Sequence, residues 1–159
     1  MTFVEYLLQY GGLVFALLGM ALVVIIPGYN SGVGVGMVGE ATTGLLMDEP
    51  EKFGKSLILQ MMPASQGLYG FVIAIMTLSR LRVDMGLQEG LYILVACLPM
   101  TIVGGPTALA QARVAVAGVQ LLARNEDEMT KKVIYAVMVE TYALLAFVTS
   151  IILLNQVTF

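Results

Sequence analysis

A single carboxylate, Glu140, lies inside the apolar segment 133–154, which reads VIYAVMVETYALLAFVTSIILL. At a rise of ~1.5 Å per residue, this segment is long enough to cross a bilayer core of ~30 Å as a helix. A charged side chain near the middle of such a helix costs on the order of 2.5 to 3.5 kcal/mol, and charges found there usually take part in ion or proton transfer. The sequence therefore predicts that Glu140 is the functional group and that other segments supply its partners.

Polar side chains in two other apolar segments are predicted to lie at the depth of Glu140. Counted from the nearest polar turn, Gln111 lies 11 residues before residue 122, Glu140 about 10 after residue 130, and Ser65 and Gln66 lie 12 and 13 after residue 53. These separations place all four side chains roughly 15 to 20 Å deep, near the bilayer midplane. We therefore expect three helices to present polar groups at one level.

The segment that carries Ser65 and Gln66 also contains a proline. Met62, Ser65, Gln66 and Tyr69 follow the i, i+3, i+4, i+7 spacing of one helical face. Pro63 has no backbone N–H and crowds the carbonyl four residues earlier, so the helix is expected to loosen there. The carbonyl of Met62 then becomes available to a ligand.

Together these groups form an oxygen-only set of one carboxylate, amide carbonyls, a hydroxyl and a main-chain carbonyl. Such a set suits a hard cation rather than a soft transition metal. One carboxylate balances one positive charge, so Na+ fits better than Ca2+ or Mg2+. The alternative is that the polar side chains only hydrogen-bond one helix to another. The predicted ligands are Met62, Ser65, Gln66, Gln111 and Glu140.

The composition indicates an integral membrane protein. Of the 159 residues, 58% are hydrophobic and only 12% are charged, which leaves too little polar surface for a water-soluble domain. A net charge of −3 without any basic run argues against a nucleic-acid partner. The chain has no His, and its one cysteine, Cys97, lies in an apolar run where it is expected to pack. An intramembrane enzyme would need a nucleophile with a base or a metal cluster, so this class is disfavoured.

Four long apolar segments separated by polar turns predict an all-α protein with four transmembrane helices. The segments cover residues 5–47, 53–80, 88–122 and 130–156. With four crossings, the turns 48–55 and 124–132 lie on one side and both termini on the other. The positive-inside rule then places these two hairpin loops in the cytoplasm and the termini outside, in a multi-pass protein of the cell membrane. The basic residues of the two loops are Lys52, Lys55, Arg124, Lys131 and Lys132, against Arg80 and Arg82 on the other side.

The two halves of the chain resemble each other when one is shifted by 76 residues. Matching pairs include Lys55 with Lys131, Met62 with Met138 and Phe71 with Phe147. The sequence therefore predicts two fused helical hairpins, residues 1–82 and 83–159. Ala64 falls on Glu140 in this register, so only the second hairpin carries the ion-binding carboxylate.

The first and third segments are expected to form crowded inner helices of an assembly. The stretches 31–44 and 104–118 are dense in Gly, Ala, Ser and Thr, which lets helix backbones approach closely in lipid. In the 76-residue register Arg113 lies level with Met37, one turn from Glu40. We expect these two charges to pair within or between subunits, with contact to lipid head groups as the alternative.

Three stretches resemble a known family, the proteolipid (K or c) subunit of V-type ATPases. They are GKSLILQMMPASQGLYGFVIA at 54–74, ALAQARVAVAGVQLLA at 108–123 and IYAVMVETYALLAF at 134–147. The resemblance spans nearly the whole chain and is strongest to the sodium-translocating bacterial form. It implies a duplicated four-helix protein whose copies form a homo-oligomeric rotor ring. One departure is Ser65, which stands in ASQ where the most similar forms have GTQ, so the hydroxyl is kept.

The resemblance also implies how the site works. Na+ would be held by the carbonyl of Met62, the hydroxyl of Ser65, the amides of Gln66 and Gln111 and the carboxylate of Glu140. The tyrosine that hydrogen-bonds the glutamate and holds it closed in this family matches Tyr69.

Further expectations concern the rest of the pump. The chain would be a non-catalytic subunit without an ATP site, turned by ATP hydrolysis elsewhere past a stator subunit with an essential arginine. The central-stalk subunits would dock on the cytoplasmic loops, and lipid would surround the ring. A ring that carries H+ is the alternative, although two amides and a hydroxyl beside the carboxylate favour Na+. A self-contained ion channel or small carrier is the alternative of another class.

Overall fold

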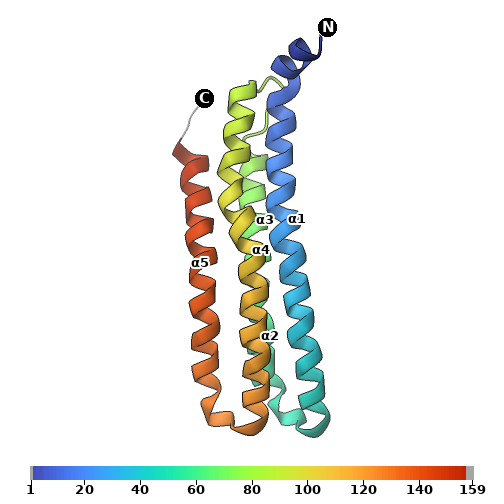
Figure 1. Cartoon of the computed structure of the whole chain (residues 1–159), viewed down its shortest axis with the longest axis vertical. Coiled ribbons are helices and arrows are strands. Elements are labelled where there is room, and N and C mark those ends of the chain that lie inside the picture. Colours follow the sequence, from blue (N-terminus) through green and yellow to red (C-terminus); the bar gives the residue numbers. More distant parts are fainter. Residues whose placement is uncertain (1, 157–159) are drawn as a thin grey trace.

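The computed structural model describes residues 2–156, which fold into an elongated bundle of antiparallel helices (Figure 1). The α-helices are α1 (Phe3–Asp48), α2 (Phe53–Met61), α3 (Ser65–Leu78), α4 (Leu87–Arg124) and α5 (Met129–Gln156). Short 3-10 turns, η1 (Pro50–Lys52), η2 (Met62–Ala64) and η3 (Glu126–Glu128), lie between them. The predicted all-α class is confirmed, and the helices begin and end within a few residues of the predicted segments.

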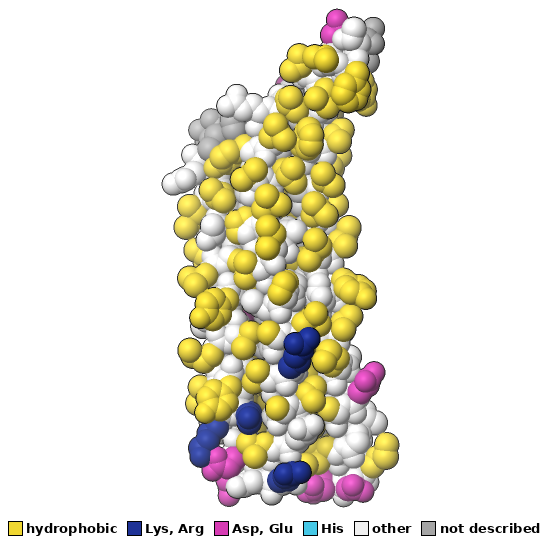
Figure 2. Space-filling view, viewed as in Figure 1, with side chains coloured by type: hydrophobic (Ala, Val, Ile, Leu, Met, Phe, Trp, Pro, Cys, Tyr) yellow, Lys and Arg dark blue, Asp and Glu magenta, His cyan; other side chains and the backbone are white. Residues whose placement is uncertain are grey.

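Four stretches of the described residues are long and apolar enough to cross a membrane. They are Phe3–Asp48, Pro50–Leu78, Leu87–Arg124 and Glu126–Gln156. Apolar side chains cover most of the length of the face seen in Figure 2, and charged side chains gather toward the end that carries the hairpin turns. A surface of this kind is stable against lipid rather than water, so the chain is a membrane protein.

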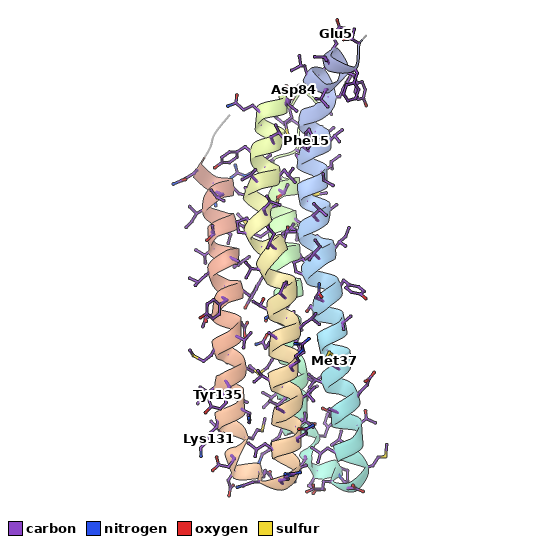
Figure 3. The ribbon with its side chains drawn as sticks, in the orientation of Figure 1. Glu5, Phe15, Met37, Asp84, Lys131 and Tyr135 are labelled. Carbon is purple, nitrogen blue, oxygen red and sulfur yellow. The ribbon has the colours of Figure 1, made fainter. Side chains whose placement is uncertain are left out.

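Both ends of the described chain lie at the same end of the bundle (Figure 1). Glu5 and the α3–α4 connection with Asp84 lie at this end, whereas Lys131 lies at the opposite one (Figure 3). This is the arrangement that four antiparallel crossings require. The side of the membrane on which each end lies stays a prediction.

The second membrane-crossing segment is not one regular helix, because it is interrupted at Pro63. The helix α2 ends at Met61, η2 covers Met62–Ala64, and α3 begins at Ser65. The carbonyl of Leu59 has no N–H to accept from Pro63, and it accepts the N–H of Met62 instead. The irregularity that the sequence predicts in the α-helical hydrogen bonds at Pro63 is therefore present, in the form of one 3-10 turn.

Glycines let α1 and α4 lie side by side along their length. A Cβ on Gly90 would collide with the backbone of Gly12, and one on Gly34 would lie 3.1 Å from the Cβ of Ala112. The small-residue stretches thus bring α1 and α4 into close contact, as their composition predicts. Long straight helices in such close contact keep residues of different helices at a fixed relative height.

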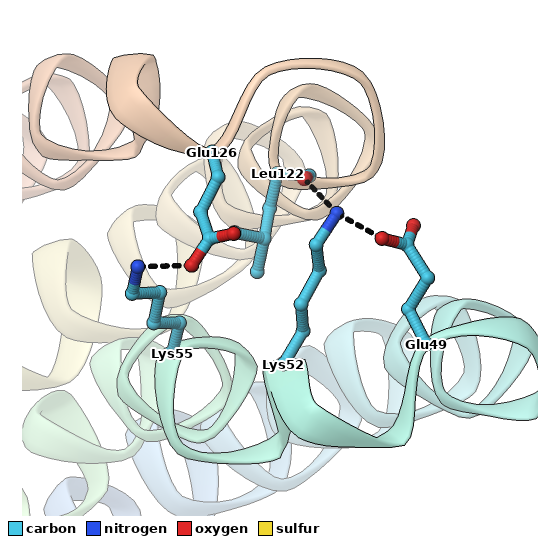
Figure 4. A network of polar contacts seen from close by, with 5 residues as sticks. All are labelled: Glu49, Lys52, Lys55, Leu122 and Glu126. Carbon is cyan, nitrogen blue, oxygen red and sulfur yellow. Dashed lines mark hydrogen bonds and ion pairs between the residues drawn. The ribbon is translucent and has the colours of Figure 1, made fainter.

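The two hairpin turns are joined by lysines of the first turn (Figure 4). Lys52 is buried, forms an ion pair with Glu49 and donates a hydrogen bond of 3.0 Å to the carbonyl of Leu122 at the end of α4. Lys55 donates a hydrogen bond to the carboxylate of Glu126 in η3. These contacts fix η1 and the first turn of α2 against the end of α4 and against η3.

Candidate functional site

Three helices and one 3-10 turn bring all the predicted site residues into a single hydrogen-bonded network. The helix α5 supplies the carboxylate, α4 one amide, α3 a hydroxyl, an amide and a phenol, and η2 a main-chain carbonyl. The members are Met62, Ser65, Gln66, Tyr69, Gln111 and Glu140. The common depth calculated from the sequence therefore corresponds to actual contact.

Both carboxylate oxygens of Glu140 accept hydrogen bonds. The hydroxyl of Tyr69 donates to Oε1 at 2.6 Å, and Nε2 of Gln111 donates to Oε2 at 3.3 Å. The ring of Tyr69 stacks on Phe147, with 5.0 Å between centroids and 27° between planes. Because Phe147 lies seven residues after Glu140 on α5, the same helix holds the carboxylate and supports the tyrosine that covers it.

The two glutamines lie fully inside the bundle and bridge α3 to α4. Gln66 and Gln111 are both 0% exposed, and Nε2 of Gln66 donates to Oε1 of Gln111 at 2.6 Å. Nε2 of Gln111 also donates to the carbonyl of Ala136 on α5 at 3.1 Å. The carbonyl can only accept, so this contact sets which end of the Gln111 amide faces α5. The amide oxygen then lies on the α3 side, toward Gln66.

Ser65 connects the 3-10 turn to this amide pair. Its hydroxyl lies 3.1 Å from the carbonyl of Met62 and 3.3 Å from Oε1 of Gln66. A hydroxyl has one proton, so it cannot donate fully to both oxygens at once. Three oxygen atoms, those of Met62, Ser65 and Gln66, are thus held together on the face of η2 and α3 next to α4.

The arrangement provides neutral oxygens on one side and a single negative charge on the other. A hard monovalent cation among these oxygens would be coordinated through their lone pairs, and the hydroxyl of Ser65 would keep its proton. Its charge would be balanced by Glu140, which removes the cost of a bare carboxylate in an apolar setting. In the structure, these groups form hydrogen bonds with one another.

Two contacts of the site were not predicted from the sequence. The carbonyl of Ala136 was missed because any helical residue carries one, and nothing in the sequence distinguishes it. The stacking of Phe147 on Tyr69 could have been found, since Phe147 lies two turns from Glu140 on the same face of α5.

The two charged residues that were expected to pair, Glu40 and Arg113, do not join the site. Glu40 and Arg113 are exposed, and within residues 2–156 no ion pair connects them. The predicted pairing of Glu40 with Arg113 within one subunit is therefore not found among the described residues. Their pairing between subunits stays a prediction.

Comparison with known proteins identifies similar sequences over most of the chain. The family of ATP synthase C subunits matches it twice, at residues 18–77 and 94–153, so that the two matches begin 76 positions apart. The V-type sodium ATPase subunit K of Enterococcus hirae is 50% identical over 150 residues, which cover 94% of this chain and 96% of that protein. The A-type ATP synthase subunit K of Methanocaldococcus jannaschii is 31% identical over 149 residues, which cover 89% of this chain and 62% of that protein.

Proposed function

This chain belongs to the family of ATP synthase C subunits, and on that premise we propose that it is a rotor-ring subunit of a V-type ATPase that carries Na+ across the membrane on Glu140. The family and the name of the Enterococcus relative support the rotor-ring role. ATP hydrolysis would take place in other subunits of the complex.

The observation that carries the choice of Na+ is the cluster of neutral oxygens beside the carboxylate. A proton carrier needs only the carboxyl group, whereas in this chain a hydroxyl and two fully buried amides form a continuous chain of hydrogen bonds from the carbonyl of Met62 to the carboxylate of Glu140. Polar groups are costly to bury, so their number and their convergence favour a ligand that several oxygens coordinate. The proposed ligands are the carbonyl of Met62 and the side chains of Ser65, Gln66, Gln111 and Glu140.

In the proposed cycle, Glu140 loads Na+ from one half-channel and crosses the lipid with its charge neutralised. A bare carboxylate facing hydrocarbon is costly, so only the occupied subunit rotates freely away from the stator. The hydrogen bond from Tyr69 to Glu140 closes the lipid-facing side of the site during this passage. An essential arginine of the stator then takes the place of Na+ and releases it.

We further propose that the hairpin loops 48–55 and 124–132 are cytoplasmic and dock the central stalk. The concentration of basic residues in these loops supports this orientation. Lys52 and Lys55 form hydrogen bonds from the first turn to the second. The two loops would therefore bind the stalk as one rigid surface.

Protection of Glu140 from a carbodiimide tests the ion. Carbodiimides react with a protonated carboxyl in an apolar setting, and bound Na+ would keep the carboxylate ionised and shielded. Added Na+ is therefore expected to slow labelling of Glu140, and K+ at equal ionic strength to do much less. Protection is expected to fade as pH falls, because protons compete with Na+ for the same oxygens.

Two other outcomes would replace the proposal. If labelling were indifferent to Na+ from mildly acidic to neutral pH, the amides would be interhelical contacts and the ring would carry H+. If the purified chain alone supported ion flux into liposomes, it would be a channel or carrier, because a rotor subunit without its stator should be silent.

A further inference from the structure

The helix α1 supplies no side chain to the site, but one of its serines contacts the backbone beside it. The hydroxyl of Ser31 donates a hydrogen bond of 2.5 Å to the carbonyl of Pro63, the middle residue of η2. Ser31 is only 4% exposed. The contact therefore lies in the interior of the bundle, one residue from the carbonyl of Met62 and two from Ser65.

The backbone at this point depends on contacts from outside its own helix. Pro63 cannot donate a hydrogen bond to Leu59, and the turn Met62–Ala64 follows 3-10 rather than α geometry. Regular i to i−4 hydrogen bonds fix a helical backbone, and here one of them is missing. A hydrogen bond from α1 is thus in a position to set where η2 lies.

The surroundings hold Ser31 in place. A Cβ added at Gly67, in the first turn of α3, would lie 3.1 Å from both Cβ and Oγ of Ser31. One turn along α1, a Cβ added at Gly34 would lie 3.1 Å from the Cβ of Pro63. The helix α1 therefore approaches α3 closely on one side of the hydrogen bond and η2 on the other, and this close packing leaves the hydroxyl little freedom to turn away.

We propose that Ser31 is a positioning residue for the cation site. Its hydroxyl, by holding the carbonyl of Pro63, fixes the carbonyl of Met62 and the side chain of Ser65 at the separation that suits Na+. This inference rests on the proposed function, because it assigns to α1 a part in the selectivity of the same site. A cation of another size, such as Li+, would meet ligands that cannot adjust to it.

The test uses assembled protein and Ser31→Ala. The concentration of Na+, and separately of Li+, that half-protects Glu140 from the carbodiimide is measured for each variant. Without the hydrogen bond, the cation itself must hold η2 in place when it binds, so the half-protecting Na+ concentration is expected to rise about three- to tenfold, which corresponds to the free energy of one ordinary hydrogen bond. The preference for Na+ over Li+ is expected to fall, because η2 becomes free to adapt.

Two further variants separate positioning from packing. Ser31→Cys keeps a side chain of similar size but donates only weakly, so it should resemble Ser31→Ala if the hydrogen bond matters. Ser150→Ala removes another fully buried serine, whose hydroxyl accepts the N–H of Met100 far from the site. This variant is a direct control, since it should change the stability of the assembly and leave both half-protecting concentrations unaltered.

The possible failures are distinct. If the unmodified protein shows no protection by Na+, the proposed ion is wrong. The inference about Ser31 is wrong in two cases, both with the unmodified protein protected by Na+. In the first, Ser31→Ala has the same half-protecting concentrations as Ser150→Ala. In the second, Ser31→Cys has the same half-protecting concentrations as the unmodified protein, so that Ser31 only fills space.

Discussion

Replacing Gln111 with alanine would remove a side chain that contacts both the amide of Gln66 and the carboxylate of Glu140. Gln111 accepts from Gln66 at 2.6 Å and donates to Ala136 at 3.1 Å and to Glu140 at 3.3 Å. The first two contacts join neutral groups and are lost whether or not a cation is bound, so they lower stability without changing affinity. The contacts with charged groups, namely the carboxylate and the cation, are the ones that affect binding.

An interaction of a buried neutral group with a charged one contributes about 1.5 to 3 kcal/mol. Since about 1.4 kcal/mol corresponds to a tenfold change, Gln111→Ala is expected to raise the half-protecting Na+ concentration roughly 10- to 100-fold. The assay is protection of Glu140 from a carbodiimide, measured in isolated assemblies over a range of Na+ concentrations. The expected shift is larger than that for Ser31→Ala, because Gln111 is a direct ligand in the proposed site.

The matched control is Gln120→Ala, which removes an exposed glutamine nine residues further along α4. Both variants lose the same side chain from the same helix, but only Gln111 contacts the site. If Gln111→Ala and Gln120→Ala gave the same Na+ dependence, with both assembled as the unmodified protein is, α4 would have to be removed from the ligand set.

Three other outcomes are expected. Glu140→Gln should abolish ion transport and the ATP hydrolysis coupled to it while the assembly stays intact, because the amide keeps the shape of the side chain but not its charge; normal transport would contradict the proposed role of the carboxylate. Tyr69→Phe loses the 2.6 Å hydrogen bond to Glu140 but keeps the ring beside Phe147, so carbodiimide labelling without Na+ should become faster, and an unchanged rate would mean that the phenol does not close the site. Lys52→Met should lower the free energy of unfolding by about 1 to 2 kcal/mol, because a buried ammonium then no longer caps the end of α4. Replacing the exposed Lys131 by Met should have little effect. Equal effects of the two variants would show that the contact between the two turns is unimportant.

The sequence by itself determined the class, the four crossings and the height of each site residue. Hydrophobic runs long enough to span a bilayer leave only helices as a solution, because no water is available there for unpaired backbone groups. In straight helices each residue adds a fixed rise, so counting from the polar turns was sufficient to place Ser65, Gln66, Gln111 and Glu140 at one level. The repeat of 76 residues was visible as matching residues in the two halves of the chain, and the two family matches begin at this spacing.

The tertiary structure alone decided which groups at that level meet. Height and helical face do not specify which neighbour a face contacts or which end of an amide points toward it. The carbonyl of Ala136, which orients Gln111, and the hydroxyl of Ser31, which holds the carbonyl of Pro63, are examples of such contacts. Both contacts depend on how closely the helices approach each other. Small residues such as Gly34 and Gly67 allow this close approach, but the distance itself is known only from the packed helices. Sequence periodicity is a property of one helix at a time, whereas these contacts are properties of pairs of helices.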